Sequence, residues 1–105
     1  MTMTINAGNN GLDYSQVAYK LAGVTELIRT PEEARELSRD SCSGIRIVLE
    51  ESAEMLLNCD DPQGYKLLTV AALMSTPEEC EQISNDTWSG ARLIVEDVTG
   101  YLLNV

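Results

Sequence analysis

The chain repeats itself. Residues 19–59 align without a gap with residues 65–105, at an offset of 46 positions, and 18 of the 41 aligned positions are identical. Chains of ordinary composition would share about two or three identities over this length. The sequence is therefore a tandem duplication. We call residues 13–58 the first copy and 59–105 the second copy, and we expect one helical unit to occur twice.

The clearest local signal is Thr-Pro-Glu-Glu, at 30–33 and again at 76–79. The threonine can accept a hydrogen bond from the amide three residues on, and proline suits the first helical position. The glutamates suit the positive end of a helix dipole. Apolar residues then continue at helical spacing, so these motifs predict long helices over 31–58 and from 77 to near the C-terminus.

A shorter helix precedes each of these motifs. Asp13 and Gln16 have the spacing of a capping box, and apolar residues at spacings of three and four predict a helix over 14–29. In the second copy, Asp61 stands before Pro62, and the apolar pattern predicts a helix over 62–75.

Ser43-Gly44 and Ser89-Gly90 interrupt the two long helices at equivalent positions. A glycine in the middle of a helix costs about 0.5–1 kcal/mol relative to alanine. We expect close approach of two helix backbones there to offset that cost. The alternative is that the β-branched residues after each glycine form short strands.

These elements predict an all-α fold. Each copy would be a helical hairpin, and the two hairpins would bury their apolar faces against each other as an antiparallel four-helix bundle with pseudo-twofold symmetry. Residues 13–105 would form this single domain, and residues 1–12 a flexible N-terminal tail.

Charge limits the partners that this chain can bind. It has 7 basic and 17 acidic residues, a formal charge of −10, which argues against direct binding to nucleic acid or to anionic membranes. A protein with a basic surface is the compatible partner. No apolar run is long enough to span a bilayer, and the first eleven residues do not resemble a signal peptide, so we expect a cytoplasmic protein.

Nothing in the sequence points to catalysis. Histidine is absent, which removes the commonest general base and the usual catalytic metal ligand. No phosphate-binding or dinucleotide motif occurs. We therefore expect no catalytic, metal or cofactor site, and no enzyme. Cys42, Cys59 and Cys80 form no close pair in sequence, and we expect buried reduced thiols, with redox sensing or an intermolecular disulfide as the alternative.

Six residues are the candidates for contact with a partner. Most of them are acidic and lie on the long helices, where Arg46 with Glu50 and Arg92 with Glu96 also fit ion pairs on a solvated face. The only tryptophan is either a core residue or an interface anchor. The candidates are Glu50, Glu51, Glu54, Trp88, Glu96 and Asp97.

The sequence favours a small regulator, adaptor or inhibitor that presents a helical surface to another protein. Apolar residues in slight excess of a core stripe, such as Ile47, Leu57 and Leu93, support this interpretation, and self-association as a homodimer is one use for them. The alternative is a nucleic-acid mimic, of the kind that phages encode, whose two rows of acidic residues occupy the basic groove of a DNA- or RNA-binding protein. An enzyme would need an unusual carboxylate or thiol mechanism.

Overall fold

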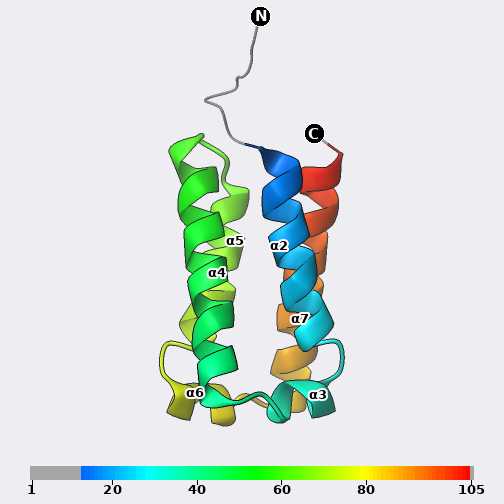
Figure 1. Cartoon of the computed structure of the whole chain (residues 1–105), viewed down its shortest axis with the longest axis vertical. Coiled ribbons are helices and arrows are strands. Elements are labelled where there is room, and N and C mark those ends of the chain that lie inside the picture. Colours follow the sequence, from blue (N-terminus) through cyan, green and yellow to red (C-terminus); the bar gives the residue numbers. More distant parts are fainter. Residues whose placement is uncertain (1–12, 105) are drawn as a thin grey trace, which may run out of the picture.

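The computed structural model describes residues 13–104, and within them it has six helices and no strand, which confirms the all-α class. Figure 1 shows the four longer helices side by side, with the two short ones together at one end. The predicted tail, residues 1–12, lies outside the described residues. The helices are α2 (Tyr14–Leu27), α3 (Pro31–Arg35), α4 (Arg39–Asn58), α5 (Gln63–Leu73), α6 (Pro77–Glu81) and α7 (Asn85–Leu103).

Both Thr-Pro-Glu-Glu motifs begin helices, as predicted. The Thr30 hydroxyl accepts a hydrogen bond from the Glu33 amide at 3.1 Å, and Thr76 accepts one from Glu79 at the same distance. The helices that start there are short, however, because α3 ends at Arg35 and α6 at Glu81. The prediction of uninterrupted helices over 31–58 and from 77 onward was therefore wrong.

Two serines explain the interruption. The Ser38 hydroxyl accepts from the Ser41 amide at 3.1 Å, and the Ser84 hydroxyl accepts from the Thr87 amide at 3.1 Å. Both serines have the extended backbone of an N-cap. Each side chain satisfies an amide at the start of a new helix, so the chain stops one helix and begins another within three residues.

The segments after Gly44 and Gly90 are continuous helix, which rules out the strand alternative. The expected close approach at these glycines is also wrong, because a β-carbon added to either would meet nothing within 4 Å. The crowded glycine is Gly64 on α5. A β-carbon there would lie 2.7 Å from the Ala53 carbonyl oxygen and from Leu57 Cγ on α4.

The most extensive helix contacts join the two copies. α2 packs along α7 and α4 along α5, whereas α2 and α4, both from the first copy, touch less. The short helices follow the same rule, since α3 contacts α7 and α6 contacts α4. The contacts within one copy, α2 with α4 and α5 with α7, are therefore less extensive than the contacts between the copies.

The turn between α4 and α5 fixes how these two helices meet. The Asp61 amide donates to the Leu56 carbonyl at 2.9 Å and the Asp60 amide to the Leu57 carbonyl at 3.0 Å. With Asp60 in the left-handed region at φ 59°, this is a Schellman motif. The Asp61 carboxylate then accepts from the Gln63 amide at the start of α5.

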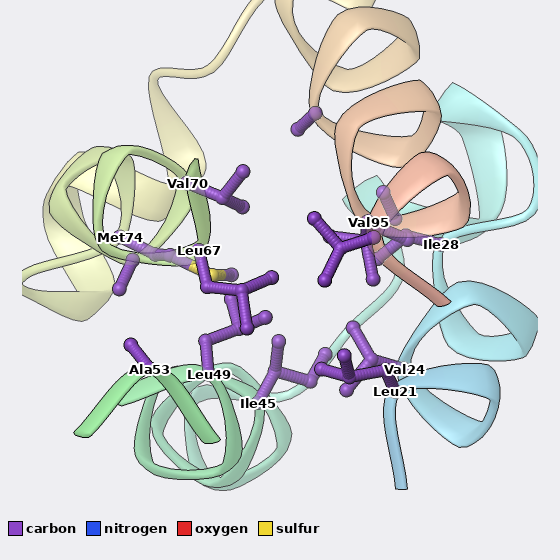
Figure 2. Packing of buried hydrophobic residues seen from close by; sticks show 14 of the residues in the cluster. Leu21, Val24, Ile28, Ile45, Leu49, Ala53, Leu67, Val70, Met74 and Val95 are labelled. Carbon is purple, nitrogen blue, oxygen red and sulfur yellow. The ribbon is translucent and has the colours of Figure 1, made fainter. Parts of the chain in front are cut away.

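One apolar core runs between the four longer helices (Figure 2). Its side chains come from both copies, and the short helices add Ala34 and Cys80. The largest completely buried ones recur at helical spacing, which is why the apolar stripes could be found in the sequence. They include Leu21, Leu49, Leu56, Leu67, Val70, Val95, Val98 and Leu102.

Candidate protein-docking surface

Three of the six candidate residues line one hollow on the surface between α4 and α5. Glu50, Glu51 and Glu54 come from α4, and the apolar part is made by Leu57 and by Leu68 of α5. Asn58 completes the lining, and the hollow has a volume of about 600 Å³. We call it the α4–α5 groove. It combines carboxylates with accessible apolar surface, since Leu68 is 38% exposed.

Helix geometry explains why these side chains gather. Residues three, four and seven apart lie on one strip of a helix, so Glu50, Glu54, Leu57 and Asn58 follow one side of α4. The backbone of α5 comes close to α4 because Gly64 has no side chain. The Schellman turn sets the two helices antiparallel at that end, which places Leu68 beside the α4 strip.

The charges of the groove are only partly compensated within the protein. Arg46 Nη1 lies 3.1 Å from Glu50 Oε1, one turn away on α4, and the Glu50 side chain remains 48% exposed. Within residues 13–104 no ion pair reaches Glu51 or Glu54. The groove is therefore a local site of net negative charge next to apolar carbon.

Glu96 and Asp97 lie apart from this groove, on α7, and both are exposed. Arg92 Nη1 lies 2.9 Å from Glu96 Oε2, which repeats the Arg46–Glu50 pair of the first copy. The rest of the groove is not repeated. The positions equivalent to Glu54 and Leu68 carry Gly100 on α7 and Ala22 on α2, so the equivalent surface lacks one carboxylate and one leucine side chain.

Trp88 does not belong to the surface. It is 2% exposed and packs in the common core, so its candidacy as a partner-binding residue is wrong for the folded protein. Its position follows from the helix start at Ser84, because the Trp88 amide donates to the Ser84 carbonyl in the first turn of α7. The indole fills core volume, as the core interpretation of this residue proposed.

A second hollow of about 550 Å³ lies beside α6, and sequence reasoning did not single it out. Several of its polar groups are already used to begin helices, since Glu79 and Thr87 donate their amides to Thr76 and Ser84. Glu78 is paired with Arg39 at 2.9 Å, and hydrogen bonds from its own backbone amide and from Arg39 lower the pKa of its carboxyl. These groups are therefore occupied by local structure.

The three cysteines occupy two kinds of environment. Cys42 and Cys80 are buried, as expected, whereas Cys59 is only half-buried, which corrects that part of the prediction. The sulfur atoms of Cys42 and Cys80 lie 2.7 Å apart, although these residues are 38 positions apart in the chain. Sequence spacing gave no sign of this pair.

No group of three His, Cys, Asp or Glu side chains suited to a metal ion occurs within residues 13–104. In that same part of the chain, no helix has the length and apolar character that crossing a membrane requires. Comparison of the chain with protein-family models, with curated proteins and with solved structures found no match.

Proposed function

We propose that this protein is a small, non-enzymatic interaction module that binds a basic, amphipathic segment of a partner protein in the α4–α5 groove. The observation that carries the proposal is the meeting of Glu50, Glu51 and Glu54 with Leu57 and Leu68 in one hollow. Carboxylates attract lysine and arginine, while the leucines bury the apolar side of the incoming segment. The net charge of −10 favours rapid association with such a segment.

The scaffold in this proposal is an antiparallel four-helix bundle with pseudo-twofold symmetry, built from the two copies. Its support is that α2 on α7 and α4 on α5 are equivalent pairs under the sequence alignment, and that both are extensive. Such a scaffold holds the groove on regular helices and not on loops, which keeps its carboxylates in fixed relative positions. A cytoplasmic location is part of the proposal and fits the three free thiols.

The duplication supplies a matched control within the same molecule. Glu50 and Glu51 in the groove correspond to Glu96 and Asp97 on α7, and Arg46 pairs with Glu50 as Arg92 pairs with Glu96. Only the α4–α5 groove adds Glu54 and Leu68, because the equivalent positions carry Gly100 and Ala22. We therefore expect binding to depend on the groove carboxylates and to be almost independent of Glu96 and Asp97.

The test uses a fluorescently labelled synthetic peptide of about 16 residues, with leucines along one helical face and lysines on the other. Its affinity for the full chain is measured by anisotropy at low and at physiological salt. The triple variant E50Q/E51Q/E54Q should weaken binding tenfold or more and reduce its salt dependence. Leu68→Ser should weaken binding by removing apolar contact, and E96Q/D97Q should bind like the natural chain.

Three results would overturn the proposal. The peptide does not bind the natural chain, or the triple variant binds as tightly as the natural chain, or the affinity does not change with salt. A fourth such result can come from size-exclusion chromatography with light scattering. A stable dimer that Leu68→Ser converts to a monomer would mean that the groove contacts a second copy of this chain.

The nucleic-acid mimic is the second candidate, and one observation favours it. All ten acidic residues of the two predicted rows are exposed. A mimic would use both rows, so E96Q/D97Q would then weaken binding to a basic DNA-binding partner as much as E50Q/E51Q does, and DNA would compete for that partner. The rows are Glu32, Glu33, Asp40, Glu50 and Glu51, and Glu78, Glu79, Asp86, Glu96 and Asp97.

A further inference from the structure

Cys42 and Cys80 bring two thiols together across the boundary between the copies. Cys42 lies in the first turn of α4 and Cys80 in α6, which packs on α4, and their sulfur atoms are 2.7 Å apart. Both residues are more than nine-tenths buried. The pair therefore sits at a fixed contact between two helices and not on a mobile surface.

In the other half of the duplication, different residues occupy the positions equivalent to this pair. The positions equivalent to Cys42 and Cys80 carry Trp88 and Ala34, a large and a small residue that both join the core. The two thiols fill less volume than a tryptophan and an alanine. A cavity of about 110 Å³ adjoins them, lined also by Arg35 and Glu81, which are exposed. The cavity therefore links the two cysteines with exposed side chains at the surface.

We propose that Cys42 and Cys80 are a redox-modification site, at which a small-molecule disulfide converts the two thiols into an intramolecular disulfide that ties α6 to α4. In the first step, the thiolate of one cysteine attacks a sulfur of the small disulfide. A mixed disulfide forms and one small thiolate leaves. In the second step, the other cysteine attacks the protein sulfur of the mixed disulfide and displaces the second small thiolate.

The two steps balance. The protein loses two protons and two electrons, and the small disulfide gains them as two thiols.

Burial raises the pKa of Cys80 to about 12, with hydrogen bonding to Cys42 and the charge of Glu81 acting in the same direction. Arg35 on α3 is the cation lining the cavity. Because thiolate is the reactive form, we expect the reaction to be slow near pH 7 and faster in mildly alkaline solution.

Oxidised glutathione is the probe, used on the folded, fully reduced chain at about pH 8. Thiols titrated after denaturation should fall from three to one, and the mass should decrease by about 2 Da. Peptide mapping should join residues 42 and 80. The midpoint of thermal unfolding should rise by roughly 10 °C, because the bond closes a long loop in the unfolded chain.

Cys59→Ser is the matched control and should form the same bond with the same rise in the unfolding midpoint. Cys42→Ser and Cys80→Ser should not form it. The proposal is overturned if the natural chain keeps all its thiols, if Cys59 enters the disulfide, if glutathione adducts persist without closure, or if the closed form unfolds at a lower temperature than the reduced form. The mapping on the natural chain decides these cases even where a variant fails to fold.

Discussion

The Tyr101 hydroxyl donates a hydrogen bond to the Asp61 carboxylate, with 3.1 Å between Tyr101 Oη and Asp61 Oδ2. This contact joins the last turns of α7 to the turn between α4 and α5. Asp61 is 6% exposed, so its carboxylate depends on protein donors. The hydrogen bond to Asp61 also raises the pKa of Tyr101, since it favours the protonated phenol.

Tyr101→Phe should therefore lower the free energy of unfolding by about 1–2 kcal/mol, because the buried carboxylate loses a donor. Urea unfolding followed by circular dichroism measures the change. Tyr65→Phe is the control, since Tyr65 is 64% exposed, and it should change stability by less than about 0.5 kcal/mol. Equal losses in the two variants would mean that the contact with Asp61 does not stabilise the fold.

Gly64→Ala should destabilise the protein by about 1–3 kcal/mol. The new β-carbon would collide with the Ala53 carbonyl oxygen and with Leu57, both at 2.7 Å. Gly44→Ala and Gly90→Ala should instead stabilise it by about 0.5–1 kcal/mol each, because alanine favours the helix and nothing lies nearby. A stabilising Gly64→Ala would show that α4 and α5 are less closely packed than described.

Ser52→Ala should raise the free energy of unfolding by about 1 kcal/mol. Ser52 is 1% exposed, and its hydroxyl has no hydrogen-bond partner within residues 13–104. The equivalent position in the second copy carries Val98, which is completely buried. Ser43→Ala is the control. It should raise the free energy of unfolding only by the smaller difference in helix propensity between serine and alanine. A loss of stability in Ser52→Ala would indicate that the hydroxyl does have a partner in solution.

The local parts of this fold could be predicted from the sequence, and the contacts between distant parts could not. The Thr30 and Thr76 caps depend on residues within four positions, so their motifs are enough to place the helix starts. Ser38 and Ser84 also cap helices by a local mechanism. Their signal was overlooked because both serines also fall in register with the apolar stripe of a longer helix.

The crowded glycine and the thiol pair depend on which helices meet. The sequence does not reveal the crowding at Gly64, because the contacts of Gly64 are on α4. It does not reveal the thiol pair either, because Cys80 lies in the other copy from Cys42. The sequence singles out Glu50, Glu51 and Glu54 by their spacing on one helix, but it does not predict that they line a groove. Leu68 was missed because it comes from a neighbouring helix whose packing on α4 no local pattern reveals.

The free energy of unfolding should also fall as the pH becomes alkaline, because of Cys80. Its pKa is raised to about 12 in the fold, mainly by burial, whereas the pKa of a cysteine in an unfolded chain is about 8.5. Between these values the unfolded chain releases a proton that the folded chain keeps. The stabilising contribution is therefore complete below about pH 8.5 and is lost as the pH rises toward 12, by at most about 1.4 kcal/mol per pH unit.

Urea unfolding of the reduced chain between about pH 7.5 and 10 tests this slope. Cys80→Ala should flatten the decline relative to the natural chain. Identical slopes in the natural chain and Cys80→Ala would show that this thiol titrates normally in the fold.

The pairing of α2 with α7 has a consequence for synthesis on the ribosome. α4 and α5 are neighbours in the chain, so their hairpin can form while later residues are still being added. Among the helices of residues 13–104, α2 is made before the others, yet the helix on which it packs most, α7, is the last of them. The part of its apolar side that faces α7 therefore stays uncovered until α7 has been made, and the docking of α7 closes the core between these helices.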